Sequence, residues 1–282
     1  MVTEAEVKLP DGRTLHYYDT HEDESNARVA VFWHHGTPNV GSPPEPLFSS
    51  AEENGLRWVS YDRPGYGGSP PDPGRDIASA AADVAAIADA LSIGRFAVLG
   101  HSGGGAHALA CGALMPDRVI AVVSMSSPAP RDAEGLDWFA GWSKSGVEEQ
   151  HAARAGRAVL EAYLPTAEFD PDTFTPGDQS ALETTWSWLA EVAGQAMEEG
   201  DEGMVEDLLA GAHGWGFGPA DITVPVLIIH GDQDRMVPSA HGKWLAANCP
   251  TAEFRLAPGA GHITVLDSGP AALEWLHDRA SS

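Results

Sequence analysis

Two patterns of hydrophobic positions alternate along the 282-residue chain. Short apolar runs rich in β-branched and aromatic residues predict strands that are covered on both faces. Stretches with apolar residues three and four positions apart predict amphipathic helices between them. We predict strands at 3–9, 13–18, 28–34, 56–61, 96–99, 119–125, 223–229 and 252–256, and helices at 47–54, 76–91, 103–115 and 239–248. This alternation predicts an α/β fold, a mostly parallel sheet flanked by helices and opened by an antiparallel hairpin.

The strand pattern disappears between 131 and 219, where prolines and glycines separate amphipathic helices. The clearest predicted helix there places apolar residues from Leu182 to Met197 on one face. We therefore predict one core domain, formed by 1–130 and 220–282. A helical cap, or lid, is predicted as an insertion into that core at 131–219.

Five of the nine tryptophans lie in the predicted cap: Trp138, Trp142, Trp186, Trp188 and Trp215. Aromatic side chains on a helical insertion are suited to wall an apolar pocket above a reactive site. We take Trp138, Trp142 and Trp186 as candidate substrate-binding residues. The alternative, in which these tryptophans form the hydrophobic core of the cap itself, stays open.

The sequence Gly-His-Ser-Gly-Gly, residues 100–104, lies between a predicted strand and a predicted helix. In a G-x-S-x-G sequence at such a place, the serine sits on a strained turn with its hydroxyl exposed at the edge of the sheet. The flanking glycines permit positive φ and a close approach of strand and helix. Ser102 is therefore the candidate nucleophile, and the N–H of Gly103 is a candidate donor to a substrate oxyanion. A structural turn without chemistry is the alternative.

Three further loops follow predicted strands. The sequence His-Gly-Thr-Pro at 35–38 makes the main-chain N–H of Thr37 a candidate second oxyanion donor. Asp234 is the candidate acid that orients an imidazole, with Asp232 as the runner-up, and His262 on a glycine-flanked loop is the candidate base. Because ligands of parallel sheets bind beyond the carboxyl ends of the strands, we expect these loops to meet at one edge.

Together these motifs resemble those of the α/β-hydrolase family, in its capped members with a serine nucleophile. The resemblance covers the chain from Arg28 onward and implies the α/β-hydrolase fold with an inserted helical cap. The serine at position 102 differs from the haloalkane dehalogenases and epoxide hydrolases of this fold, which use an aspartate there. Proline iminopeptidases carry a tryptophan after the serine, whereas Gly103 follows here, and this disfavours an aminopeptidase.

The composition narrows the range of partners. The chain has 16 Lys and Arg residues against 41 Asp and Glu residues, a formal net charge of −25. Such a surface repels phosphate backbones and anionic membranes, so we expect a small-molecule substrate and neither nucleic acid nor a membrane as partner. The absence of a signal-peptide pattern and of any long apolar run predicts a cytoplasmic protein. Cys111 and Cys249 are expected to be free thiols, and the oligomeric state stays open.

Serine becomes a nucleophile when a base removes its proton, which would be the role of His262 with Asp234 holding the imidazole. This chemistry requires no metal and no organic cofactor. We therefore expect a hydrolase that cleaves a carboxylic ester of a small to medium, largely uncharged substrate through an acyl-enzyme. The alternatives are a lyase, perhydrolase, C–C bond hydrolase or aminopeptidase on the same triad, or a non-catalytic ligand receptor.

Overall fold

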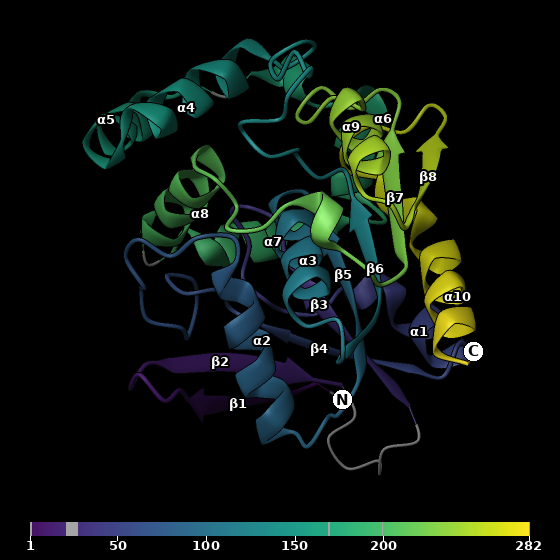
Figure 1. Cartoon of the computed structure of the whole chain (residues 1–282). Coiled ribbons are helices and arrows are strands. Elements are labelled where there is room, and N and C mark those ends of the chain that lie inside the picture. The colour runs from purple at the N-terminus through teal and green to yellow at the C-terminus, as the bar shows by residue number, and fades with distance from the viewer. Residues whose placement is uncertain (1, 21–27, 169, 199, 282) are drawn as a thin grey trace.

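An eight-stranded sheet forms the centre of the molecule, in the order β1-β2-β4-β3-β5-β6-β7-β8 (Figure 1). The computed structural model describes residues 2–20, 28–168, 170–198 and 200–281. The strands are β1 (Thr3–Lys8), β2 (Thr14–Asp19), β3 (Val29–His34), β4 (Leu56–Tyr61), β5 (Phe96–His101), β6 (Val119–Met125), β7 (Val226–Gly231) and β8 (Ala252–Ala257). The six strands from β3 to β8 are parallel, whereas β1 pairs with β2, and β2 with β4, in the antiparallel sense. The predicted fold class is confirmed.

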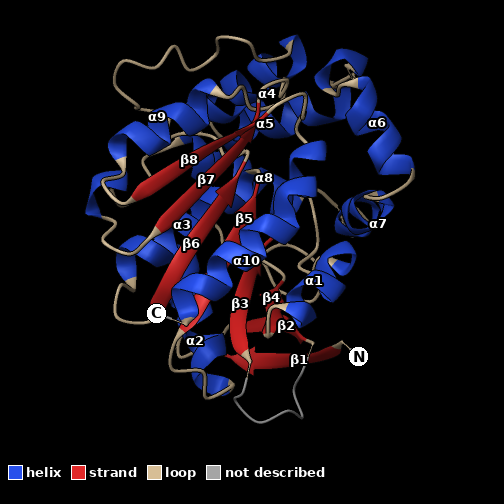
Figure 2. Cartoon of the chain, turned by 90° about the vertical axis from the view of Figure 1, so that its right-hand side faces the viewer, coloured by secondary structure: helices blue, strands red, loops and turns tan. Residues whose placement is uncertain are grey.

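Helices cover both faces of the sheet (Figures 1 and 2). The helices of the core are α1 (Phe48–Glu53), α2 (Ser79–Ala90), α3 (Gly103–Leu114), α9 (Ala240–Asn248) and α10 (Gly269–Ala280). Apolar residues of α2, α3 and α9 pack on one face, and those of α1 and α10 on the other. The segment between β6 and β7 holds α4 (Lys144–Ala155), α5 (Arg157–Tyr163), α6 (Pro176–Glu183), α7 (Ser187–Ala196) and α8 (Glu202–Ala212).

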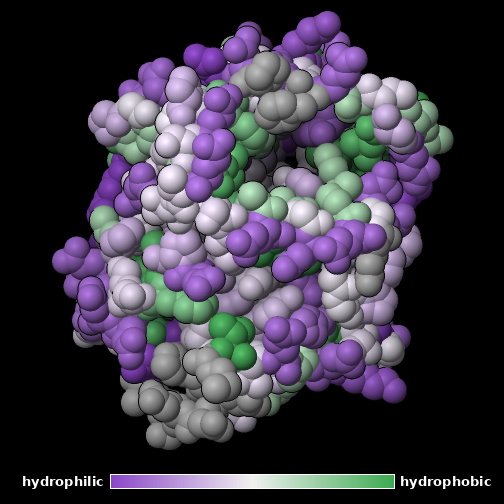
Figure 3. Space-filling model, turned by 180° about the vertical axis from the view of Figure 1, so that it is seen from behind, coloured by the Kyte–Doolittle hydropathy of each residue, from purple (hydrophilic) through white to green (hydrophobic). Residues whose placement is uncertain are grey.

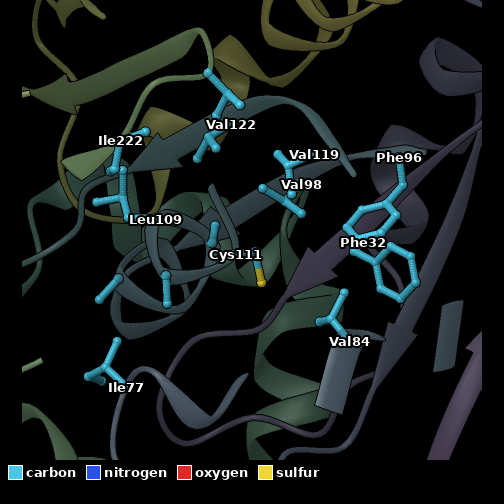
Figure 4. Close-up of a cluster of buried hydrophobic side chains, with 14 of the residues drawn as sticks. Phe32, Ile77, Val84, Phe96, Val98, Leu109, Cys111, Val119, Val122 and Ile222 are labelled. Atoms are coloured by element: carbon cyan, nitrogen blue, oxygen red, sulfur yellow. The ribbon is translucent and has the colours of Figure 1, made fainter. Parts of the chain in front are cut away.

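Successive residues of the central strands face opposite layers of the core. Phe32 of β3 packs on Phe96 of β5, with ring centroids 4.7 Å apart, in the cluster beneath α2 and α3 (Figure 4). Its neighbours Val31 and Trp33 belong to the cluster on the other face. All are fully buried, and burial of such a side chain stabilises the fold by about 1.5–3 kcal/mol. This explains why the strand sequences are continuously apolar.

Two predicted helices differ from those of the structure. The helix predicted from Leu182 to Met197 is broken, because α6 ends at Glu183 and Thr184 leaves the helical region, with φ −131° and ψ −100°. Helix α2 begins at Ser79 instead of Asp76. Asp76 Oδ1 accepts the Ser79 N–H at 2.8 Å and Ser79 Oγ accepts the Asp76 N–H at 3.2 Å, so the two residues form a turn before the helix.

We use the name cap segment for residues 131–219, and the division into core and cap domains stays a prediction. In Figure 1, α4 and α5 lie farthest from the sheet, with α8 between them and the core. On the face seen in Figure 3, hydrophilic residues alternate with pale areas and smaller hydrophobic patches. Among the described residues, none of the helices has the length and hydropathy needed to cross a membrane.

Candidate active site

Ser102 occupies a strained turn between β5 and α3. Its φ of 56° and ψ of −129° lie outside the regions that residues with a side chain usually adopt. A Cβ on Gly100 would collide with the carbonyl of Gly104, and a Cβ on Gly104 would collide with the carbonyl of His34. Both glycines are therefore needed for strand, turn and helix to approach so closely, and the serine side chain is left at the end of the sheet.

The loops after three strands bring Ser102, His262 and Asp234 together. His262 Nε2 lies 3.0 Å from Ser102 Oγ, and its Nδ1 lies 2.8 Å from Asp234 Oδ2. The other carboxylate oxygen of Asp234 accepts the N–H groups of Met236 and Val237 at 3.0 and 2.8 Å. Burial opposes ionisation of Asp234, but the neighbouring His262 and these hydrogen bonds lower the pKa of the carboxyl below its usual value. The arrangement suits transfer of a proton from the serine to the imidazole.

Asp232, the runner-up for the acid, lies away from the imidazole. It is exposed, and its Oδ1 accepts the N–H of Gly259 at 2.8 Å. Its contact therefore stabilises the beginning of the loop that carries His262, while Asp234 contacts the imidazole itself.

Thr37 and Gly103 lie side by side next to Ser102. A Cβ built on Gly103 would lie 3.0 Å from Thr37 Oγ1, and one on Gly36 would lie 3.6 Å from the Cβ of Ser102. Gly103 is the first residue of α3, so its N–H has no carbonyl of a preceding turn to bond. The positions are compatible with two N–H donors on one side of the serine.

A buried ionic network holds the loop at 35–38. Arg63 donates to the carbonyl oxygens of His35 and Gly36 at 2.6 and 3.0 Å, and its Nε donates to Asp207 Oδ1 at 3.0 Å. Asp207 belongs to α8 of the cap segment, and its Oδ2 accepts the hydroxyl of Thr37 at 2.6 Å. The cap segment therefore contacts the candidate oxyanion loop directly.

Asp207 has further partners in Arg75, at 2.6 Å, and in the hydroxyl of Tyr66, at 3.0 Å. Burial alone would raise the pKa of Asp207, but the two guanidinium groups, Arg63 and Arg75, hold it well below its usual range. Asp207 was missed in the sequence because it lies among ordinary helical residues, far along the chain from its partners.

A second carboxylate of the cap segment holds the loop that carries His262. Asp178 of α6 accepts the main-chain N–H of His262 at 3.1 Å, that of Ile263 at 3.0 Å and that of Thr264 at 2.8 Å. Burial of Asp178 opposes ionisation, but the hydrogen bonds from Thr264 and Thr175 lower its pKa. Sequence analysis missed this residue too, since an aspartate near a helix start is typical of capping alone.

A cavity of about 450 Å³ opens above Ser102, between the core and the cap segment. Its lining includes Thr37, Gly103 and the two candidate residues Trp138 and Trp142. The indole rings of these tryptophans stack with centroids 4.8 Å apart and planes inclined by 21°. The cavity therefore offers a flat aromatic wall near the serine.

Trp186, the third candidate, lies outside this cavity. It is buried in the core cluster on the α10 side of the sheet, and its indole N–H donates to Asp267 at 2.7 Å. The break between α6 and α7 turns it toward the core. The structure therefore gives Trp186 a packing position in the core and not a place in the wall of the cavity.

The described residues contain no group of three or more His, Cys, Asp or Glu side chains placed to hold a metal ion. Cys111 and Cys249 are both buried and unpaired by disulfides. Burial lowers the pKa of His34 and of His35 well below the ordinary value. His35 Nδ1 is 2.8 Å from the carbonyl of Gly36 and its Nε2 accepts the N–H of Arg63 at 3.2 Å, so it orients the loop.

A family model for the alpha/beta hydrolase fold matches residues 29–268, from β3 to the loop before α10. The chain belongs to this family. The match covers the turn at 100–104, which we call the elbow, the turn that carries Asp234 and the loop that carries His262, and it confirms the predicted family.

Three known proteins illustrate the range of the similarity. A non-heme chloroperoxidase of Streptomyces lividans is 29% identical over 249 residues, which cover 83% of each chain. A 2-(acetamidomethylene)succinate hydrolase of Mesorhizobium japonicum is 24% identical over 241 residues, 85% of this α/β hydrolase and 83% of the relative. The structure of an enol-lactonase from Burkholderia xenovorans LB400 has a TM-score of 0.72 at 22% identity, over 99% of this chain and 100% of the other, and thus shares the fold.

Proposed function

We propose that this α/β hydrolase is a serine hydrolase that cleaves a carboxylic ester, or a related acyl bond, of a small to medium substrate through an acyl-enzyme. The observation that carries the proposal is the continuous chain of contacts from Ser102 Oγ to His262, at 3.0 Å, and from His262 to Asp234, at 2.8 Å. The chain of contacts opens into an aromatic-walled cavity of about 450 Å³, which suits a largely uncharged substrate.

In the proposed reaction, Ser102 Oγ attacks the acyl carbon while His262 Nε2 takes the hydroxyl proton. Asp234 stabilises the resulting imidazolium. The oxyanion accepts hydrogen bonds from the N–H groups of Thr37 and Gly103, each donor of this type contributing on the order of 2.7–4 kcal/mol. His262 then protonates the leaving alcohol, and water hydrolyses the acyl-enzyme with the same histidine as base.

The names of the relatives are compatible with this chemistry and show how widely it varies. One is named a 2-(acetamidomethylene)succinate hydrolase, one a non-heme chloroperoxidase, and another, from Acinetobacter calcoaceticus, a bifunctional esterase/perhydrolase. A carboxylic ester is the simplest substrate that the proposed serine nucleophile could cleave. A lyase or C–C bond hydrolase would use the same three residues on a different substrate.

The test is hydrolysis of p-nitrophenyl acyl esters of increasing chain length, with parallel labelling by a fluorophosphonate probe. We expect Ser102→Ala and His262→Ala to lose turnover by a factor on the order of 10⁴–10⁶. Asp234→Asn should lose turnover by a factor on the order of 10⁴, whereas Asp232→Asn, a change of the same kind outside the triad, should not.

Ser145→Ala is the matched control for the nucleophile, because Ser145 lines the same cavity in the cap segment. It should keep both turnover and probe labelling. Turnover that survives Ser102→Ala, or a folded wild-type protein that neither hydrolyses any ester nor reacts with the probe, would overturn the proposal. A product that is an aldehyde or ketone without a free acid would indicate a lyase instead.

A further inference from the structure

The main chain of His262 is held from two sides. Its N–H donates to Asp178 Oδ2 at 3.1 Å, and its carbonyl oxygen lies 2.8 Å from His101 Nε2. Burial lowers the pKa of His101 to about 3, so the ring is neutral and Nε2 donates its proton to the carbonyl. The imidazole of His262 is then fixed at Nδ1 by Asp234. Each of these three holding groups comes from a different element: the elbow, the turn after β7 and α6.

Of the three residues that fix His262, Asp178 is the one that belongs to the cap segment. It is nearly fully buried, and its two oxygens receive the N–H groups of three consecutive residues at 262–264 together with the hydroxyl of Thr264 at 2.9 Å. It also caps its own helix through the N–H of Thr175 at 3.1 Å. A Cβ on Gly261 would collide with the carboxylate, so the loop is shaped around it.

We propose that Asp178 is a positioning residue for the catalytic base, so that α6 must be docked on the core for His262 to reach Ser102. The inference rests on the proposed function, since it assigns a role in a reaction that uses His262. It makes the cap segment a part of the catalytic apparatus in addition to a wall of the cavity.

A carboxylate is the group that this position requires. Its two oxygens only accept hydrogen bonds, and all the groups that face it are donors. An asparagine of the same shape would offer one accepting oxygen, and its NH₂ group would face main-chain N–H groups that it cannot bond. Asp178→Asn should therefore loosen the loop at the histidine without leaving a large cavity.

The charge of Asp178 has a second consequence. His262 gains a proton during acyl transfer, and a carboxylate bonded to its own N–H favours that cation. The titratable groups that face His262 are Asp234 and His230 from β7 and its turn, His101 from the elbow, and Asp178 from α6. Substitution of Asp178 removes a negative charge near His262 and leaves the hydrogen bond between Asp234 and the imidazole in place.

The experiment compares Asp178→Asn with Asp232→Asn on the best ester of the panel. Both changes remove one carboxylate charge that accepts a main-chain N–H of the histidine loop, but Asp232 bonds Gly259 and does not contact His262. We expect Asp178→Asn to lower kcat on the order of 10²-fold with KM changed less than threefold, as for a displaced catalytic group. The acidic limb of its pH–rate profile should move to lower pH, and Asp232→Asn should show neither change.

Thr264→Val is the second variant, in case Asp178→Asn does not fold. It removes the hydroxyl that donates to Asp178 and accepts the N–H of Gly261 at 2.8 Å, while the main-chain bonds remain. It should lower kcat in the same sense by a smaller factor. Near-ultraviolet circular dichroism and the rate of fluorophosphonate labelling report folding and serine reactivity separately for each variant.

The inference is overturned if folded Asp178→Asn keeps the wild-type kcat and pH profile, or if its loss appears in KM alone. It is also overturned if Asp232→Asn gives the same kcat loss, because the effect would then belong to loop stability in general. If the wild-type protein itself shows neither turnover nor labelling, the proposed function has failed instead, so the two failures are distinguishable.

Discussion

The cap segment has an inner and an outer layer that are attached to the molecule in different ways. The inner helices α6 and α8 each place a buried carboxylate, Asp178 and Asp207, among several donors of the core. The outer helices α4 and α5 pack on α8 through a small apolar cluster. Glu149 of α4 lines the cavity, and burial raises its pKa to about 7, with no opposing charge from the described residues.

The difference separates two tasks of an insertion. The carboxylates of the inner layer contact the two loops that hold Thr37 and His262, where the proposed reaction requires constant geometry. The outer layer borders the cavity with the carboxyl of Glu149, and it is attached to α8 by the apolar cluster and by the ion pairs of Arg157 with Glu202 and Glu206. We therefore expect substitutions in the inner layer to change stability and turnover, and those in the outer layer to change pH behaviour and substrate range.

The largest expected effect is that of Asp207→Ala, which removes the anchor of α8. It would leave Arg63 and Arg75 buried with their charges uncompensated, and breaking a buried ion pair in this way costs about 3–5 kcal/mol. Chemical denaturation should therefore show a large loss in the free energy of unfolding.

Asp89→Ala is the matched control for that change. Asp89 pairs with Arg118 at 2.7 Å, but on the surface, where such pairs contribute about 0–1 kcal/mol. Equal losses for the two variants would contradict the distinction between the layers, since the burial of Asp207 would then have no energetic consequence.

A smaller effect is expected from Trp186→Phe, which breaks the contact between α7 and the turn at 264–268. The indole N–H bonds the carboxylate of Asp267, and we expect a loss of about 2 kcal/mol because a hydrogen bond to a charged group and some packing are both removed. Trp244→Phe is the control, because its indole donates at 2.9 Å to the carbonyl of Glu134 at an exposed site. Thermal unfolding should show a clearly smaller shift for the control.

The smallest effect concerns Glu149, and its sign depends on pH. A carboxyl whose pKa is raised from 4.5 in the unfolded chain to about 7 in the folded protein costs no stability below pH 4.5, and it lowers the free energy of unfolding progressively as pH rises from 4.5 to 7. In thermal unfolding, Glu149→Gln should therefore be about as stable as the wild type at pH 5 and more stable at pH 8. The gain in the free energy of unfolding should be about 1 kcal/mol, after allowance for the partial exposure of the side chain. Glu148→Gln, an exposed neighbour, should show no such trend. An opposite trend for Glu149→Gln would contradict the absence of an opposing charge near it among the described residues.

The core of the fold could be predicted because its signals are local. Continuous apolar runs mark strands covered on both faces, and the glycines at 100 and 104 mark a turn that no other residue fits. The same locality placed Ser102, Asp234 and His262 at strand ends, where the structure brings them within hydrogen-bond distance. Their catalytic roles stay a prediction.

The cap segment was harder to predict because its decisive contacts join residues far apart in sequence. Asp178 bonds a loop 84 positions further along the chain, and Asp207 bonds Arg63, 144 positions before it. Local periodicity also extended one helix through Thr184, where the main chain turns so that Trp186 reaches the core. No signal within a window of a few residues distinguishes such an aspartate from a helix cap, or such a tryptophan from a pocket wall.

The glycine at position 261 limits how this α/β hydrolase can be redesigned and how its homologues can diverge. An insertion can be exchanged freely between homologues only if the scaffold functions without it. Here the absence of a Cβ at Gly261 leaves the space that the carboxylate of Asp178 occupies. The core and the cap segment are therefore complementary at this point and not independent modules. A chimera that receives the cap segment of a homologue must receive with it an acceptor equivalent to Asp178. Selection will therefore tend to keep Gly261 and this acceptor together.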